Sequence, residues 1–272
     1  MASYQATFLR RSTPGLLCGA AAENHVYWVA DAAESVGGRV TVTDGVTWVH
    51  TPHKKQIEIM FPRILPDRAA QTVDRIVRLC RRRDINRLAC WSLDPARPRD
   101  LGALLVARGF EWNWKPRWMW LKLDRLNTSH RKPGGLTVEL AGDEDVWDID
   151  DMPYYNRTEA EGWRVLNNAT PRRAWQFVGK IDGEVVGQTK LNVTTGRLGI
   201  AGIYNVGVRK AFRQQGIAKA IIGKALDHAA GLGCIHAMLN GTGEAVYRQL
   251  GFEVIGYGQT WVSKEALRSR YP

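Results

Sequence analysis

The chain has 272 residues, of which 44% are hydrophobic and 24% are charged, and its formal net charge is +11. This length allows one large domain or two of ordinary size, and the composition excludes a mainly disordered chain. No apolar run reaches the roughly 18 residues of a membrane span, and the N-terminus lacks the apolar core of a signal peptide. Four widely spaced cysteines, without a Cys-x-x-Cys pair or any other metal-ligand spacing, predict a reduced cytoplasmic protein that holds no metal.

Positive charge is concentrated in the first half of the chain. Residues 1–136 contain 22 Lys and Arg against 12 Asp and Glu, whereas residues 137–272 contain 16 against 15. A basic half suits nucleic acid, acidic lipid or a polyanionic cofactor, but it is also typical of an ordinary basic surface. We favour the ordinary surface, so neither nucleic acid nor a membrane is expected as a partner.

Apolar periodicity in the first half predicts a helix over Thr72–Arg82, a strand over Arg87–Ser92 and a helix over Asp100–Arg108. The segment Arg108-Gly-Phe-Glu111 then resembles Leu250-Gly-Phe-Glu253 near the other end of the chain. This weak internal repeat is about one domain long and favours two related domains. A polar, turn-rich stretch at 127–135 indicates a linker between a first domain at 1–126 and a second at 136–272.

The second half alternates strands with three helices. Asp182-Gly183 is a strong two-residue hairpin signal between strands at Trp175–Ile181 and Glu184–Val193. The other predicted elements are strands at 136–140, 198–208, 235–239, 252–255 and 259–262, an acidic helix at 143–151, and helices after Gly216 and at 244–250.

The most informative segment, Arg213-Gln-Gln-Gly-Ile-Ala218, joins the strand at 198–208 to the helix that follows. This order aims backbone N–H groups and the positive end of the helix dipole at one point, which favours a bound phosphate. Gly216 allows the backbone to approach a pyrophosphate closely, and positive charge is added by Arg209, Lys210 and Arg213. Taken alone, the turn is equally typical of an ordinary strand–helix connection.

A second motif lies one helix and one strand downstream: Asn240-Gly-Thr-Gly-Glu-Ala-Val-Tyr-Arg-Gln-Leu-Gly-Phe-Glu253. In order and spacing the two motifs resemble those of the GNAT superfamily, the acyl-CoA-dependent N-acyltransferases, over residues 136–263. The resemblance implies an α/β (α+β) fold with two GNAT-like domains, each a mixed, mostly antiparallel twisted sheet flanked by helices. The first domain, which lacks a comparable glycine turn, would be a degenerate copy and the second the catalytic one.

The resemblance also implies how acetyl-CoA, the expected cosubstrate, binds. The strand before the turn would bind the pantetheine arm by its backbone, and the turn with the first helical residues would bind the pyrophosphate. These residues are Val206, Gly207, Val208, Arg213, Gln214, Gln215, Gly216, Ile217, Ala218 and Lys219. Tyr247 matches the general acid that protonates the departing CoA thiolate, and Asn240 matches a residue that often contacts the pantetheine or its water.

The chain departs from the family pattern at two positions. Asn205 stands where many members have a glutamate that serves as general base through water, and an amide can only hold a water or the substrate. Alternative bases are His236, Glu159 and Glu161, although a neutral amine needs little or no base. Gly243 replaces the usual alanine and loosens the start of its helix.

The segment that covers the acceptor pocket in this family is acidic here. Six carboxylates fall within residues 143–151, followed by Glu159 and Glu161. They favour a positively charged amine, but a solvated acidic face explains them equally well. Tyr154, Tyr155 and Trp163 are candidate walls of the same pocket, and all three are equally compatible with a place in the core.

These observations predict an N-acetyltransferase that acts on a primary amine of a small molecule, by direct attack on the thioester and with Tyr247 as the acid. Val208 is the first candidate for the N–H group that polarises the thioester carbonyl. Two other hypotheses stay open: a tRNA-dependent aminoacyl or peptidyl transferase of tandem GNAT type, and a non-catalytic acyl-CoA sensor. We expect a monomer or homodimer.

Overall fold

The computed structural model describes residues 7–43, 45–82, 85–129, 132–145, 149–154 and 157–263. Contacts divide the chain into two compact units that each draw on both ends of the sequence. The larger unit consists of Met1–Trp28 and Trp118–Ile255, and the smaller unit consists of Val29–Arg117 and Gly256–Pro272. The division of the sequence at 127–135 stays a prediction about its two related halves.

The larger unit contains a mixed sheet with the strand order β6-β11-β10-β9-β8-β7. Only β10 and β11 pair in parallel, and the other neighbours are antiparallel. The predicted hairpin is confirmed, because Asp182 and Gly183 both have positive φ between the paired residues Ile181 and Glu184. The strands are β6 (Arg117–Lys122), β7 (Thr137–Leu140), β8 (Ala174–Ile181), β9 (Glu184–Val193), β10 (Ala201–Val208) and β11 (His236–Asn240).

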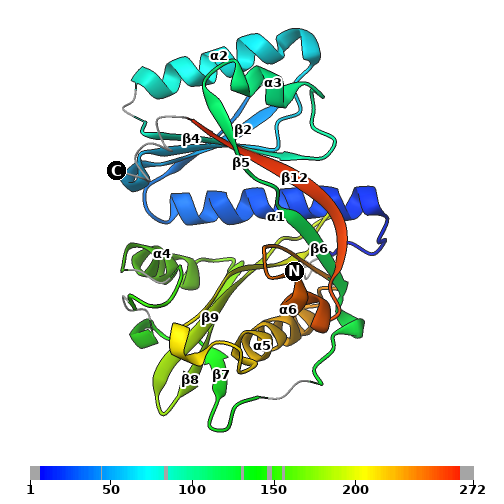
Figure 1. The fold of residues 1–272 in the computed structure, drawn as a ribbon. Helices are drawn as coiled ribbons and strands as arrows, with labels where there is room; N and C mark the ends of the chain where they lie inside the picture. Colours follow the sequence, from blue (N-terminus) through cyan, green and yellow to red (C-terminus); the bar gives the residue numbers. More distant parts are fainter. Residues whose placement is uncertain are drawn as a thin grey trace, which may run out of the picture. The chain divides into compact units, whose positions relative to one another are not determined.

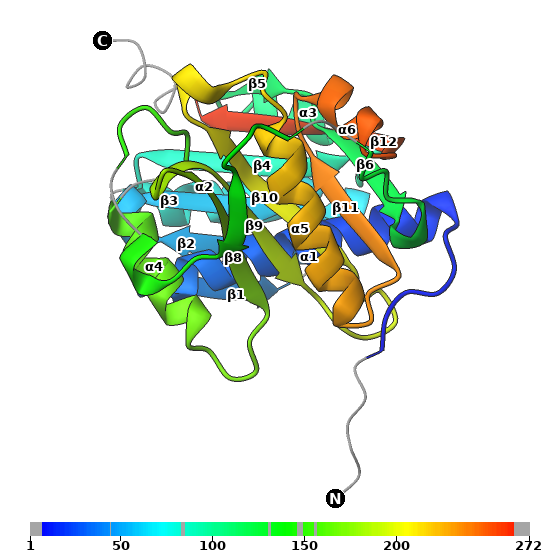
Figure 2. The same cartoon turned by 90° about the horizontal axis from the view of Figure 1, so that it is seen from below.

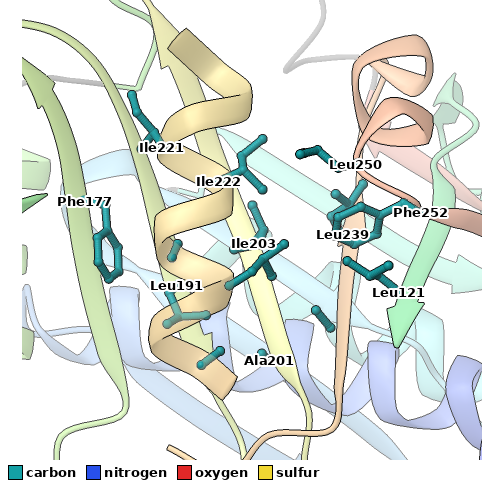
Figure 3. Packing of buried hydrophobic residues seen from close by; sticks show 14 of the residues in the cluster. Leu121, Phe177, Leu191, Ala201, Ile203, Ile221, Ile222, Leu239, Leu250 and Phe252 are labelled. Atoms are coloured by element: carbon teal, nitrogen blue, oxygen red, sulfur yellow. The ribbon is translucent and has the colours of Figure 1, made fainter. Parts of the chain in front are cut away.

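Helix α5 (Ile217–Gly231) covers one face of this sheet, as Figure 2 shows. Its side chains Ile221 and Ile222 are fully buried against apolar residues of the strands (Figure 3). Gly179 on β8 and Gly187 on β9 make room for this packing, because a Cβ atom at either position would lie 2.9 Å from Ile221 Cδ1. The sequence therefore places glycines where the helix approaches the sheet most closely.

The opposite face of the sheet meets α1 (Pro14–Glu34), which the sequence did not reveal. The side chain of Asn24 donates to the carbonyl oxygens of Ile200 at 2.9 Å and Asn192 at 3.2 Å, and it accepts from the Tyr204 hydroxyl at 2.7 Å. A Cβ atom on Gly202 would lie 2.0 Å from Asn24 Oδ1, so the glycine is required for this contact. Two further helices belong to the unit, α4 (Arg157–Asn167) and α6 (Glu244–Gln249).

The strands of the smaller unit pair in the order β1-β2-β3-β4-β12-β5. Strands β3 and β4 pair in parallel and the others are antiparallel. Helices α2 (Pro66–Arg82) and α3 (Leu101–Val106) lie over one face (Figure 1) and confirm the two helices predicted there. The strands are β1 (Arg39–Thr43), β2 (Val46–Thr51), β3 (Gln56–Met60), β4 (Arg87–Leu93), β5 (Phe110–Trp114) and β12 (Glu253–Ser263).

The two sequence halves exchange a strand. β6 comes from the first half but pairs with β11 in the larger unit, from Trp118 opposite Asn240 to Lys122 opposite His236. β12 comes from the end of the chain, and its residues Gly258–Val262 pair with β4 in the smaller unit. β12 is also one long strand where the sequence predicted two. The mixed, mostly antiparallel α/β fold class is confirmed.

Candidate functional site

The edge of β10 that faces β9 is interrupted by a β-bulge. Tyr204 pairs with Lys190 and Gly207 pairs with Gln188, so Asn205 and Val206 together lie opposite the single residue Thr189. Asn205 has φ of 49°, a left-handed conformation that is uncommon for a residue with a side chain. A bulge re-aims the strand and its backbone groups, which makes this a typical place for a functional site.

The ladder between β10 and β11 ends at the same level. It pairs Ala201–Ile203 with Ala237–Leu239, whereas β10 continues to Val208 and β11 to Asn240. We call the part of β10 and β11 beyond this last pair the open segment. Both strands of the open segment are described. Within it, the backbone groups of β10 and β11 do not form ladder hydrogen bonds with each other.

The backbone N–H of Val208 faces the open segment. The next residue, Arg209, donates its backbone N–H to Val186 on β9 at 3.0 Å, so by strand alternation the N–H of Val208 points away from β9. The carbonyl oxygen of Val208 already accepts from Arg213 Nε at 3.1 Å. An extended ligand that lies along β10 can therefore bond to this N–H as an added strand does.

The glycine turn follows directly. After a short 3-10 turn at Lys210–Phe212, Gln214 and Gly216 adopt positive φ of 63° and 87°, and α5 begins at Ile217. No side chain caps this helix and no acidic residue lies in its first turn. The first N–H groups of a helix have no partner within the helix, and together with the dipole they form an anion site.

The charges near the turn are fewer than the sequence suggests. Arg209 is held by Asp151 at 2.9 Å and by Glu184 at 3.3 Å, so its expected contribution to a positive turn is offset. Lys219 donates to Gln249 Oε1 at 2.9 Å, which leaves its charge in place beside the start of α5. The anion site thus rests on the backbone, Arg213 and Lys219 more than on Arg209.

Tyr247 lies on α6, close behind the end of β11. Its ring packs against the backbone of Gly241 and Gly243, where an added Cβ atom would lie 3.1 and 3.3 Å from Tyr247 Cε2. Burial raises the pKa of Tyr247, and the nearby phenol of Tyr154 raises this pKa further. The phenol therefore keeps its proton at neutral pH, as a general acid must.

Asn240 ends β11 and carries an unsatisfied donor. Its Nδ2 atom is buried and has no hydrogen-bond partner among the described residues. Buried amide nitrogens in folded proteins nearly always have a partner, so an acceptor from outside the chain fits this position. The atom lies at the end of the open segment, where a ligand along β10 would pass.

The alternative base His236 lies elsewhere. It begins β11, four residues before Asn240, which places it about 13 Å along the strand. Its ring is buried, accepts from Trp120 Nε1 at 3.2 Å, and burial lowers its pKa. His236 therefore lies outside the open segment.

The segment Met152–Tyr154 lies against β10 beside the bulge, a feature the sequence did not show. Gln188 Nε2 donates to the carbonyl oxygens of Pro153 at 3.2 Å and Tyr154 at 2.9 Å. A Cβ atom on Gly207 would lie 2.7 Å from Pro153 O, so Gly207 is required for this approach. The sequence has no clear signal for this contact, because β9 also contains Thr189, Lys190 and Asn192 beside Gln188.

Several of the acidic residues have partners of their own. Asp145 pairs with Lys180 at 2.6 Å, Asp151 pairs with Arg209, and Glu159 lies 3.6 Å from the buried Lys190. The predicted acidic helix is wrong in its described part, because only Asp143–Asp145 form a short 3-10 turn. Residues 146–148 lie outside the described residues.

Of the four weak substrate candidates, Glu159 and Trp163 meet at the buried Lys190. Glu161 is exposed on α4, Tyr155 lies outside the described residues, and Glu159 is held by Lys190. Trp163 is 3% exposed, stacks on Trp28 with ring centroids 5.8 Å apart, and lies 4.5 Å below Lys190 Nζ. Their part in acceptor binding stays a prediction.

The described residues form neither a metal cluster nor a membrane-spanning helix. No three or more His, Cys, Asp or Glu side chains in that part of the chain are arranged to hold a metal ion. None of the described helices is both long and apolar enough to cross a membrane. All four cysteines are free.

Residues 143–252 match the family model described as "Acetyltransferase (GNAT) family". No curated protein matches the chain. A GCN5-related N-acetyltransferase from Kribbella flavida is similar in structure, with 15% identity, a TM-score of 0.63, and coverage of 88% of this chain and 95% of that one. A GCN5-related N-acetyltransferase from Sphaerobacter thermophilus has 15% identity and a TM-score of 0.58, over 94% of this chain and 95% of that one.

A tandem GNAT protein from the clavulanic acid biosynthesis pathway is also similar, with 17% identity, a TM-score of 0.58, and coverage of 81% of this chain and 78% of that one. At such identities these likenesses concern the fold, and they extend over both units. The matched segment 143–252 contains the bulge, the open segment, the glycine turn and Tyr247. Residues 143–252 therefore form a domain that matches the GNAT acetyltransferase family, whose fold supports acyl transfer as its general chemistry.

Proposed function

We propose that this protein is an N-acetyltransferase that transfers the acetyl group of acetyl-CoA to a primary amine of a small molecule. The observation that carries the proposal is the open segment, which ends the β10–β11 ladder at Ile203 and Leu239 just before an uncapped helix start at Gly216. A long ligand with a pyrophosphate at one end and an amide-rich arm matches this sequence of groups.

The residues of the chain fit acetyl-CoA in three respects. The turn from Arg213 to Lys219 offers backbone N–H groups and two positive charges to the pyrophosphate. Val206, Gly207 and Val208 offer a strand edge to the pantetheine arm, and the N–H of Val208 points toward that arm. The unsatisfied Nδ2 of Asn240 supplies a further donor from the facing strand.

The reaction needs one bond formed and one broken. The amine nitrogen attacks the thioester carbonyl carbon, the C–S bond breaks, and the departing thiolate takes a proton from the phenol of Tyr247. The amine loses a proton to water as the amide forms, and the phenolate of Tyr247 regains one from solvent, so charge and atoms balance. No covalent enzyme intermediate is involved.

Asn205 has no capacity to accept a proton, so we propose that it orients the amine or a water and that the acceptor reacts as a neutral amine. The internal pairing of Asp145, Asp151 and Glu159 supports this choice, because these carboxylates already neutralise lysine or arginine side chains. These paired carboxylates therefore give less reason to expect a strongly cationic acceptor.

The test is calorimetry of the full chain with acetyl-CoA, followed by CoA release with a panel of small primary amines. We expect binding and at least one amine that accelerates CoA release. No binding by the intact protein would overturn the proposal. Binding without turnover across the whole panel would favour a sensor over an enzyme.

A further inference from the structure

Thr189 occupies a special position in the larger unit. It lies in the middle of β9, is fully buried, and is the one residue opposite the two bulge residues Asn205 and Val206. Its hydroxyl donates to the carbonyl oxygen of Tyr204 at 3.1 Å. The side chain therefore fixes the peptide group that enters the bulge.

The planarity of that peptide has a direct consequence. The carbonyl of Tyr204 and the N–H of Asn205 belong to the same trans peptide unit and point in opposite directions. Since Thr189 on β9 draws the carbonyl toward β9, the N–H of Asn205 points away from β9, toward β11. At this level the β10–β11 ladder has just ended at Ile203, so the N–H faces the open segment.

We infer that Thr189 is a positioning residue for acyl transfer: through the Tyr204–Asn205 peptide it holds the Asn205 N–H as a donor to the thioester carbonyl oxygen. The inference rests on the proposed function. The Asn205 N–H would be a second backbone donor of β10, three residues before that of Val208. Preorganised N–H groups of this kind stabilise the oxyanion that develops when the amine attacks.

A purely structural role for Thr189 is the alternative, and the same strand pair supplies its control. Thr194, in the turn after β9, is also buried, and its hydroxyl donates to the carbonyl oxygen of Ile200 at 3.2 Å. Both threonines thus donate a buried hydroxyl to a carbonyl at or just before β10. Only Thr189 does so at the bulge.

The experiment compares three variants of the full chain, Thr189→Val, Thr189→Ser and Thr194→Val. Each is measured for melting temperature, calorimetric affinity for acetyl-CoA, and kcat with the best amine. We expect Thr189→Val to lower the melting temperature by about 2–4 °C, since it loses one buried hydrogen bond. Thr194→Val should lower it by more, since the Thr194 hydroxyl also accepts from Asn24 Nδ2 and from the N–H of Ile200. Thr189→Val should lower kcat about tenfold with little change in acetyl-CoA affinity, and Thr189→Ser should restore kcat.

A direct readout is the ¹H–¹⁵N resonance of the Asn205 amide. We expect it to shift in Thr189→Val and to keep its wild-type position in Thr194→Val. Equal kcat in the two valine variants, or an unmoved Asn205 resonance, would overturn the positioning role while the wild-type activity stands. If the wild type neither binds acetyl-CoA nor releases CoA, the proposed function fails and the role of Thr189 fails with it.

Discussion

Both units contain a strand, a helix and a second strand parallel to the first. The pairing of the two parallel strands is interrupted in only one unit. In the smaller unit the parallel pair β3 and β4 forms five consecutive residue pairs along the whole of β3, Gln56–Met60. In the larger unit the corresponding pair β10 and β11 stops after three, and β10 carries the bulge. A continuous ladder leaves no backbone donor for a ligand, so the interruption distinguishes a site from a scaffold.

The connections into the helices differ in the same sense. α2 follows Phe61–Leu65, which contains no glycine, and begins with Pro66 and an acidic Asp67 in its first turn. α5 follows a turn with two positive-φ residues and has no acid in its first turn. A carboxylate at a helix start competes with phosphate for the same N–H groups, so the α2 start is a poor anion site.

The largest expected effect comes from separating the two sequence halves. A fragment of residues 127–272 lacks α1 and β6, and with them the buried core residues Met119 and Leu121 and the hydrogen bonds of Asn24. We expect the fragment to lose its near-ultraviolet circular dichroism and to bind no acetyl-CoA. Co-expression with residues 1–126 as a second chain is the control and should restore both the circular dichroism signal and acetyl-CoA binding. If the fragment alone is folded and binds acetyl-CoA, the expectation that the halves depend on each other is contradicted.

The next effect is at the helix starts. Gly216→Trp places a bulky side chain at a position with φ of 87° and should weaken acetyl-CoA affinity by about 100-fold or more. The matched change Leu65→Trp, at the exposed residue just before α2, should leave the affinity unchanged. Calorimetry of both proteins measures the difference, and equal losses would place a ligand in the smaller unit as well.

Tyr247→Phe probes the chemistry rather than the binding. We expect kcat to fall about 100-fold with acetyl-CoA affinity within about threefold of wild type, because a phenyl ring packs similarly but carries no proton. Tyr257→Phe, on β12 in the smaller unit, is the control and should change neither value. A wild-type kcat in Tyr247→Phe would remove this residue from the mechanism.

The pH profile sharpens the same assignment. Because burial raises the pKa of Tyr247, its phenol stays protonated beyond the ordinary titration of tyrosine near pH 10. The loss of kcat at high pH should therefore begin above that value in the wild type, and it should be absent from the residual rate of Tyr247→Phe. Measurement in saturating acetyl-CoA separates this limb from changes in binding.

The smallest effect is expected from Gly243→Ala, which introduces the residue the family usually carries. The new methyl group would lie 3.3 Å from Tyr247 Cε2 and would displace the ring by a few tenths of an ångström. We expect kcat to fall by about threefold, with the melting temperature unchanged or slightly lowered, since Gly243 is the N-cap of α6 and alanine is a poorer N-cap than glycine. An increase in kcat would show that glycine holds Tyr247 away from its best position.

The predictable parts of the fold were those with local signals. The hairpin at Asp182-Gly183 and the helices beginning near Thr72 and after Gly216 follow from turn chemistry and apolar spacing within a few residues. No local sequence pattern indicates the exchange of β6 and β12, because β6 pairs with a strand more than 100 residues away. Nothing in the spacing around Asn24 indicates that its amide bonds to residues near 200.

The residues of the candidate site also divide into those with a local sequence signal and those without one. Gly216 and Tyr247 lie in motifs and were found from the sequence, and Asn205 was singled out at the position that the structure places in the bulge. Thr189 and Gln188 were missed, because each acts through a contact with a backbone carbonyl that is distant in sequence. Their roles and those of the motif residues stay predictions until the variants are measured.

The exchanged strands also set the order in which the newly made chain can fold. β6 is synthesised more than 100 residues before its partner β11, and β4 is synthesised long before the β12 residues that complete its sheet. Neither sheet can close until almost the whole chain has left the ribosome, so domain-by-domain folding during synthesis is unavailable to this protein. Until then the apolar edges of β4 and β6 depend on chaperones or on rapid completion of translation for protection.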